Sequence, residues 1–227
     1  MSTILYVLLQ EVSMPERVVE ESFLSILMKG GWILLPIFIL LLIAVYIIIE
    51  RSLVISANLK DDKMWISRIT ELISENKPEK AQALCTQIGN SSSKVVAAGL
   101  HEIRNGKQEV EEAMQSESRQ QIIRLEQGMG NLGIIATIAP MLGFVGTIFG
   151  VITIFYNISV TNEISIGSIS DGLYQKMICS GVGLLVGIIA YSGYHILNNK
   201  IDKTVSRIEK DSNDVLKSIR SFYKEVI

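Results

Sequence analysis

The stretch LGIIATIAPMLGFVGTIFGVITIFYNI, residues 132–158, has no charged side chain in 27 positions. A helix of this length reaches about 40 Å at 1.5 Å per residue, which is enough to cross a hydrocarbon layer of about 30 Å with some tilt. The stretch therefore predicts a membrane-spanning helix.

Two further runs have the same character. Residues 32–50 contain 18 uncharged positions before Glu50, with no polar face such as a buried helix of a soluble protein would show. Residues 177–197 contain no acid, lysine or arginine. A hydrophobic content of 48% together with a mean hydropathy of +0.37 agrees with these runs. The sequence predicts an all-α integral membrane protein with three transmembrane helices.

Lysine and arginine are distributed unevenly around the three runs. Two lie before the first run, eleven between the first and second, one between the second and third, and seven after the third. Basic residues favour the cytoplasmic side. Residues 1–31 and the loop 159–176 are therefore expected on the outer side of the membrane. A helical domain at 51–131 and a C-terminal helix at 198–227 are expected in the cytoplasm.

The segments outside the membrane have helical periodicity. Residues 14–29 fit an amphipathic helix on the outer membrane face, and residues 60–130 fit several helices with a loop at 89–93. The polar segment 107–128 enters the second run without a proline, which favours one continuous helix. Apolar residues recur at helical spacing after the third run. Two of the spans are thus predicted to extend into long cytoplasmic helices.

Small residues form a face on the second and third runs, which predicts close helix packing. They are Ala139, Gly143, Gly146, Gly150, Gly183 and Gly187. Pro140 would free a backbone carbonyl in mid-helix and could kink the second span.

Two hydroxyl residues, Thr147 and Ser180, lie beside the small-residue face. One interpretation makes them pore-lining, because a hydroxyl can both donate and accept a hydrogen bond. The other makes each hydroxyl a donor to a carbonyl of its own helix. The spans themselves contain no carboxylate, so any ion carrier must come from another chain.

Other classes of site are not indicated. Cys85 and Cys179 have no metal-ligand spacing, and a net charge of −2 gives no field for nucleic acid. No nucleophile–base set or phosphate loop is present. We expect no cofactor, no metal, no nucleic-acid partner and no enzymatic activity; membrane lipid is an expected partner.

The residues around these hydroxyls carry a family resemblance. APMLGFVGTIFGVI at 139–152 resembles the APLLGLLGTVxGMI signature of the ExbB/TolQ/MotA family, and GLYQKMICSGVGL at 172–184 resembles its third-span motif, GIxEALxxTxxGL. Gly30, Gly31, Trp32, Pro36 and the Glu50–Arg51 pair resemble the family's first span and its exit. Three spans with an outside N-terminus are similar to ExbB and TolQ, whereas subunits of the MotA type have four.

The resemblance implies a pentamer whose second and third spans line a pore. It also implies a single-span partner of the ExbD/TolR type, which brings an ion-carrying aspartate to Thr147 and Ser180. A periplasmic TonB-like protein would receive the motion. Two positions depart from the family pattern: Gln175 replaces a glutamate of the pore, and Ile189 replaces a proline.

The function expected on this basis is that of the pore-forming stator subunit of an ion-driven motor that energises TonB-dependent import. A TolQ-like envelope role, a gliding motor or a passive oligomeric scaffold or channel are alternatives. The sequence leaves open whether the ion is a proton or sodium.

Overall fold

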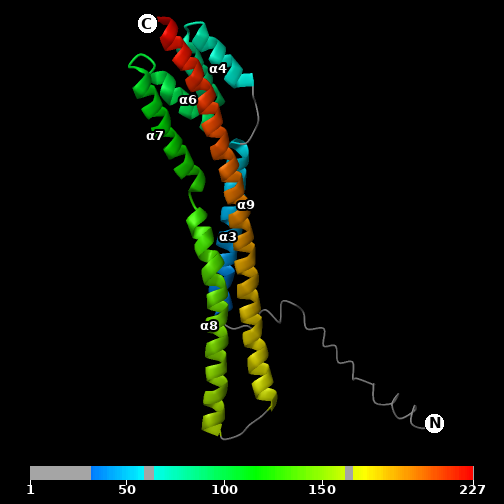
Figure 1. Ribbon diagram of the computed structural model, residues 1–227. Helices are drawn as coiled ribbons and strands as arrows, with labels where there is room; N and C mark the ends of the chain where they lie inside the picture. Colours follow the sequence, from blue (N-terminus) through cyan, green and yellow to red (C-terminus); the bar gives the residue numbers. More distant parts are fainter. Residues whose placement is uncertain (1–31, 59–63, 162–165, 227) are drawn as a thin grey trace, which may run out of the picture.

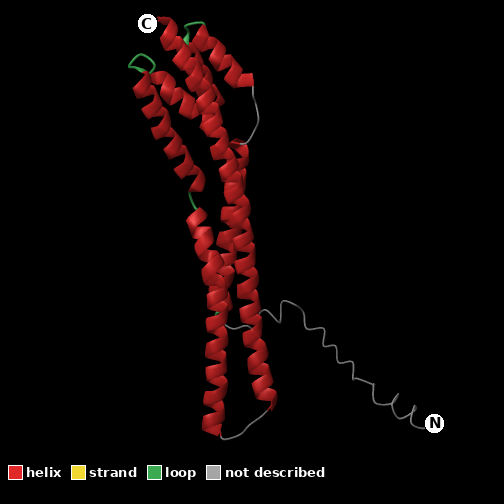
Figure 2. Ribbon diagram, viewed as in Figure 1, coloured by secondary structure: helices red, strands yellow, loops and turns green. Residues whose placement is uncertain are grey.

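The computed structural model describes residues 32–58, 64–161 and 166–226. These residues form helices joined by short turns, and no strand occurs among them. Figure 2 shows an elongated, wholly helical molecule with a cluster of short helices at one end. The predicted all-α class is confirmed. The amphipathic helix predicted at 14–29 lies outside the described residues.

Three helices are long and apolar enough to cross a membrane. They are α3 (Leu34–Asn58), α8 (Met129–Thr161) and α9 (Ile166–Val226). Figure 1 shows α8 and α9 side by side along most of the rod, with α3 alongside them. The prediction of three membrane-spanning helices is confirmed. Exposed aromatic side chains, Trp32 at 84% and Tyr46 at 67%, lie near the two ends of the apolar part of α3, as is typical of membrane interfaces.

The connection between α8 and α9 is shorter than the predicted loop at 159–176. Helix α8 ends at Thr161 and α9 begins at Ile166. Glycine and serine in this segment favour a loop by intrinsic propensity. Pairing of the two antiparallel helices keeps most of the segment helical, since tertiary contacts override propensity.

Four short helices form the domain at the other end of the rod. They are α4 (Met64–Ser74), α5 (Pro78–Ile88), α6 (Ser91–His101) and α7 (Lys107–Glu126). The loop predicted at 89–93 is wrong for its last three residues, which form the first turn of α6. The Asn90 side chain accepts a hydrogen bond from the Ser93 backbone amide at 2.7 Å. This N-cap explains why serines that favour turns begin a helix here.

The predicted helix that runs from the polar segment into the second span is interrupted. Helix α7 ends at Glu126 and α8 begins at Met129, with Gly128 at φ +82° between them. A positive φ suits glycine, and it breaks the helical hydrogen-bond ladder. Arg51, whose side chain is only 11% exposed, donates to the Arg124 carbonyl at 3.2 Å. It thereby satisfies a carbonyl at the end of α7 and puts a positive charge at that helix's negative end.

Helix α9 has no such interruption. From Leu197 onward it buries residues at alternating intervals of four and three, which make a seven-residue repeat: Leu197, Ile201, Thr204, Ile208, Asp211 and Val215. This spacing is that of a coiled-coil seam, which holds one face of a helix against its neighbours over a long distance. The same helix therefore provides a membrane span and also packs against the domain of short helices.

Candidate functional site

The predicted small-residue faces meet where α8 and α9 cross. Ala139, Gly143, Gly146 and Gly150 are buried on α8, and Gly183 and Gly187 are buried on α9. A Cβ atom added at Gly183 would lie 2.6 Å from the Ala139 carbonyl oxygen, and one at Gly143 would lie 3.0 Å from the Ser180 Cα. The two backbones approach so closely that no larger side chain fits between them.

Pro140 lies within this contact. Helix α8 continues through it from Met129 to Thr161. A Cβ atom at Gly187 would lie 2.5 Å from the proline Cγ and 3.1 Å from the Ala136 carbonyl oxygen. The proline ring therefore occupies the space that the missing side chain of Gly187 leaves, so proline and glycine are sterically matched across the crossing.

Thr147 joins the two helices by hydrogen bonds. Its half-buried hydroxyl lies 3.2 Å from the Gly143 carbonyl oxygen of its own helix and 3.3 Å from the Lys176 carbonyl oxygen of α9. A hydroxyl has one proton, so it donates to one of these carbonyls at a time or shares the proton between them. The hydrogen bond of Thr147 to a carbonyl of its own helix, one of the two interpretations of the sequence, is therefore present. The Lys176 carbonyl of α9 is a second possible acceptor.

Ser180 lies one turn further along the same crossing, opposite Gly143. It is half-buried, and no hydrogen bond to its hydroxyl occurs within the described part of the chain. The structure thus brings Thr147 and Ser180 to adjacent turns of the α8–α9 contact, and these two turns are called the hydroxyl layer below. Of Gln175, only the backbone position in α9 is described.

Lys176 is a residue of this layer that sequence reasoning missed. A Cβ atom at Gly150 would lie 1.9, 2.4 and 2.6 Å from the Lys176 Cγ, Cδ and Cε atoms. The lysine stem therefore lies across Gly150, next to the carbonyl that Thr147 approaches. Two signals could have found it: it is four residues from Ser180, and no other lysine or arginine occurs between Arg124 and Lys200.

The two apolar runs of the crossing contain no carboxylate. The functional groups of runs 132–158 and 177–197 are hydroxyl, thiol, thioether, amide and aromatic groups and one imidazole, that of His195. This arrangement can hydrogen-bond a carboxylic acid or a carboxylate supplied from outside. Such a carboxylate could carry an exchangeable ion, and the two runs supply none of their own.

Among the described residues, Asp211 of α9 is the one buried carboxylate, at 4% exposed, and it lies where α9 packs against the domain of short helices. Burial raises its pKa, and the Ser92 hydroxyl and the Arg207 guanidinium oppose this shift in part. The Arg207 Nε atom lies 3.8 Å from Asp211 Oδ2, which accepts no hydrogen bond. In the same domain, burial raises the pKa of the Cys85 thiol to about 12.

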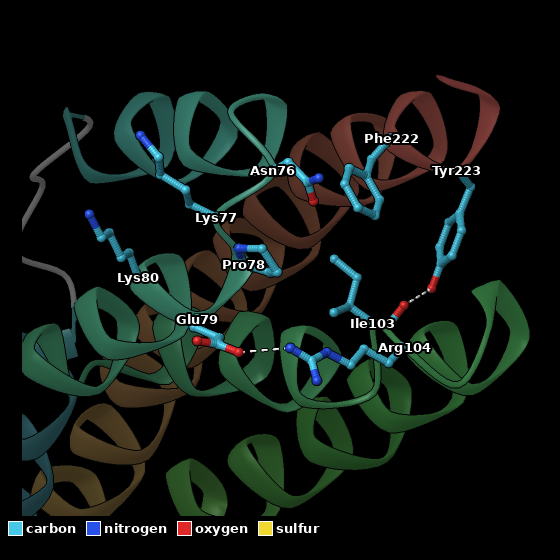
Figure 3. A pocket seen from close by; sticks show the side chains of 9 residues that line it. All are labelled: Asn76, Lys77, Pro78, Glu79, Lys80, Ile103, Arg104, Phe222 and Tyr223. Atoms are coloured by element: carbon cyan, nitrogen blue, oxygen red, sulfur yellow. Dashed lines mark hydrogen bonds and ion pairs between the residues drawn. The ribbon is translucent and has the colours of Figure 1, made fainter. Parts of the chain in front are cut away.

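A pocket of about 540 Å³ lies at the tip of this domain, between α5 and the end of α9. Figure 3 shows Glu79 paired with Arg104, and the Tyr223 hydroxyl bonded to the Ile103 carbonyl. The first contact ties α5 and the second ties α9 to the α6–α7 turn, so the pocket is part of the domain's own packing. Among the described residues, no group of three or more His, Cys, Asp or Glu side chains could hold a metal ion.

Comparison with known proteins agrees with this geometry. A family model described as the MotA/TolQ/ExbB proton channel family matches residues 87–210, which include both crossing helices. An ExbB homolog of Methanothermobacter thermautotrophicus, described as a biopolymer transport protein, is 30% identical over 54% of this chain; the match spans 43% of that protein.

Two bacterial relatives match over most of their length. The biopolymer transport protein exbB1 of Vibrio cholerae is 26% identical over 86% of this chain and 87% of its own. The Tol-Pal system protein TolQ of Haemophilus influenzae is 23% identical over 85% of this chain and 89% of its own.

Proposed function

The chain belongs to the MotA/TolQ/ExbB proton channel family, and from this premise we propose that it is the pore-forming stator subunit of an ion-driven motor in the bacterial inner membrane. The observation that carries the proposal is the layer of Thr147 and Ser180 at the α8–α9 crossing, in spans that contain no carboxylate. Such a layer can bind a carboxylic acid and release it without a fixed charge that would trap the ion.

The ring and its partner complete the pathway. Large apolar side chains remain exposed on the membrane parts of α8 and α9, among them Phe144, Phe149 and Leu184. In a closed ring, expected to be a pentamer, the next subunits and lipid would cover them. A single-span protein of the ExbD/TolR type, inside the ring, would contribute the ion-carrying carboxylate.

The orientation follows from the charge distribution. Residues 1–31 and the α8–α9 connection would face the periplasm, and α4–α7 with the end of α9 would face the cytoplasm. The cluster of basic residues after Leu197 supports this orientation. Motion produced by ion flow would then act on a partner in the periplasm.

The process that receives the motion is proposed to be TonB-dependent import. Relatives named as biopolymer transport proteins support it. The match to a TolQ over 85% of the chain favours a Tol-Pal-like envelope role as the second candidate. A passive scaffold would need neither Thr147 nor Ser180 for its function.

The test is the double variant Thr147→Val, Ser180→Ala. Valine keeps the shape of threonine and removes the hydroxyl that approaches the Gly143 and Lys176 carbonyls. We expect energy-dependent uptake to be lost, while the ring still assembles and retains its partner, because each lost hydrogen bond contributes only about 1 kcal/mol. Gln175→Ala should reduce uptake less, since that side chain does not titrate.

A matched control is Thr153→Val. Thr153 is an exposed residue of the same helix, and its hydroxyl bonds only to the Phe149 carbonyl, at 2.8 Å. Uptake by this variant should be normal. Proton flux into vesicles that contain the chain with its copurified single-span partner provides the second readout. Normal uptake and flux in the double variant would refute the pore role and return both residues to structural status.

A further inference from the structure

The cation of Lys176 remains unexplained by the proposed pathway. It is the only lysine or arginine in 75 positions between Arg124 and Lys200. Ionisable residues within membrane spans are rare, and those present usually pair with one another or with backbone carbonyls. Among the described residues, no carboxylate pairs with the Lys176 ammonium.

The position of the side chain is well defined by its neighbours. Its Cγ, Cδ and Cε carbons lie across Gly150, where a Cβ atom would come within 1.9 to 2.6 Å of them. The lysine backbone carbonyl is an acceptor of the Thr147 hydroxyl. Glycine at position 150 thus makes room for the stem along α8, which a larger residue would exclude.

Lys176 also shares a helical face with Ser180. Residues four apart in a helix lie about 40° from each other around the axis, whereas Gln175, five residues away, lies about 140° from Ser180. The ammonium therefore belongs to the face that carries the hydroxyl layer. An Ile33 side chain within 3.3 Å of a Cβ atom at Gly146 shows that this layer is level with the start of the first span.

We propose that Lys176 is the docking cation for a carboxylate of the single-span partner, at the outer end of the α8–α9 crossing. This inference rests on the proposed function and deepens it, since it names the residue that holds the partner. The Lys176 stem lies over Gly150, about one turn beyond Thr147 on α8. The ammonium therefore attracts a second carboxylate of the partner, distinct from the ion-carrying one at Thr147 and Ser180. A charge pair at the edge of the hydrocarbon layer is screened less than one in water.

The chemistry distinguishes the two sources of an anion. A lipid phosphate at the outer surface could also meet a lysine that extends toward the interface. The stem of Lys176, however, lies over Gly150 in the contact between two helices of the chain. A helix of a second protein chain could pack along that contact. The partner's carboxylate is therefore the occupant that we infer.

The test uses the complex of the chain with its copurifying single-span protein, in native membranes. Dicyclohexylcarbodiimide, a membrane-permeant reagent, couples an amine to a carboxyl group that touches it. We expect an amide cross-link from Lys176 to an acidic residue of the partner, located by mass spectrometry. Lys176→Arg keeps the charge and should retain the partner and the uptake, but give no cross-link.

Lys176→Met removes the charge and keeps a long apolar stem. We expect partner retention to fall at least about tenfold, because loss of one member of a desolvated charge pair mainly raises the dissociation rate. Lys200→Met is the matched control. Lys200 lies on the same helix, where its ammonium is 3.3 Å from the Ser52 hydroxyl. Because this half-buried contact is within the chain and far from position 176, its loss should leave retention within about twofold.

Three results would overturn the inference. The first is equal retention of the partner by Lys176→Met and by the control. The second is a cross-link in the wild-type complex that does not involve Lys176, and the third is partner retention that depends on the phosphatidylglycerol content of reconstituted vesicles and not on the residue at position 176. If uptake still depends on Thr147 and Ser180, the docking role alone fails. If no single-span protein copurifies with the chain, both the docking role and the proposed function fail.

Discussion

Replacement of Gly183 by alanine tests whether the α8–α9 crossing is set by backbone contact. The added methyl carbon would lie 2.6 Å from the Ala139 carbonyl oxygen and 3.1 Å from the Gly143 Cα. A carbon and a carbonyl oxygen rarely approach closer than about 3.3 Å. The helices would have to separate locally by about 0.7 Å, and no rotation of a side chain can relieve the contact because both neighbours are backbone atoms.

The expected change in stability is the balance of two effects. Overpacking of this kind costs about 1 to 3 kcal/mol, and alanine is favoured over glycine within a helix by up to about 1 kcal/mol. Since the clash is with backbone, we expect a net loss of about 1 to 2 kcal/mol. For a chain of this size the thermal midpoint in detergent would fall by about 3 to 6 °C.

Gly181→Ala is the matched control. Gly181 lies two residues away on the same helix, and a Cβ atom there would meet nothing within 4 Å. Only the helix-propensity gain remains, so the midpoint should rise by about 2 to 4 °C. Thermal-midpoint shifts of opposite sign in Gly183→Ala and Gly181→Ala would show that the loss of stability comes from the contact with Ala139. A comparable fall in both variants would refute the reasoning.

Two other outcomes can be measured on the domain of short helices and the end of α9. Because burial raises the pKa of Asp211 in the folded state, the folded chain binds its proton more readily than the unfolded one. That contribution to stability is complete at acid pH and is lost as pH rises through the raised value. Asp211→Asn should therefore raise the thermal midpoint at pH 7 relative to wild type, with a difference that shrinks toward pH 4; an equal or lower midpoint at pH 7 would contradict this. A cysteine that replaces exposed Asn105 should resist a membrane-impermeant maleimide in intact cells and react after lysis. Background labelling of Cys85 should be small, because its pKa of about 12 keeps the thiol protonated. Labelling of the new cysteine in intact cells would contradict the proposed orientation.

The three spans could be predicted because lipid imposes a strong constraint on sequence. A run such as 132–158 must satisfy every backbone polar group within itself and expose only apolar side chains, so composition alone reveals it. The same reasoning gave the small-residue faces, since close approach of two helices in lipid requires residues without large side chains. Both features depend only on the local sequence and on the lipid that surrounds it.

The interruption at Gly128 and the start of α6 could not be predicted in the same way. A glycine within a helical pattern can be tolerated inside the helix or can mark its end. Its φ of +82° is stabilised by Arg51, which approaches from a helix more than 70 residues earlier in the chain. Ser92, which the sequence placed in a loop, is 5% exposed because α6 packs its first turn against other helices.

The candidate site shows where pattern reasoning stops. The sequence indicates Thr147 through its place beside the glycines, but it does not distinguish a hydrogen bond within the helix from one to the other helix. The structure shows that the Lys176 carbonyl of α9 is a second acceptor, at 3.3 Å. Lys176 was counted as a loop charge because the third apolar run begins one residue after it. Its importance depends on the contact with Gly150, 26 residues earlier, which no local pattern contains.

The two helices of the crossing are connected differently to the domain of short helices, α4–α7. Helix α8 is separated from α7 by the positive-φ joint at Gly128. Helix α9 has 61 residues without a break, about 90 Å, so it is the continuous element between the Thr147 layer and the tip of that domain. There, Arg220 pairs with Glu111 at 2.9 Å and the Tyr223 hydroxyl bonds to the Ile103 carbonyl, so the end of α9 is held to α7 and to the α6–α7 turn.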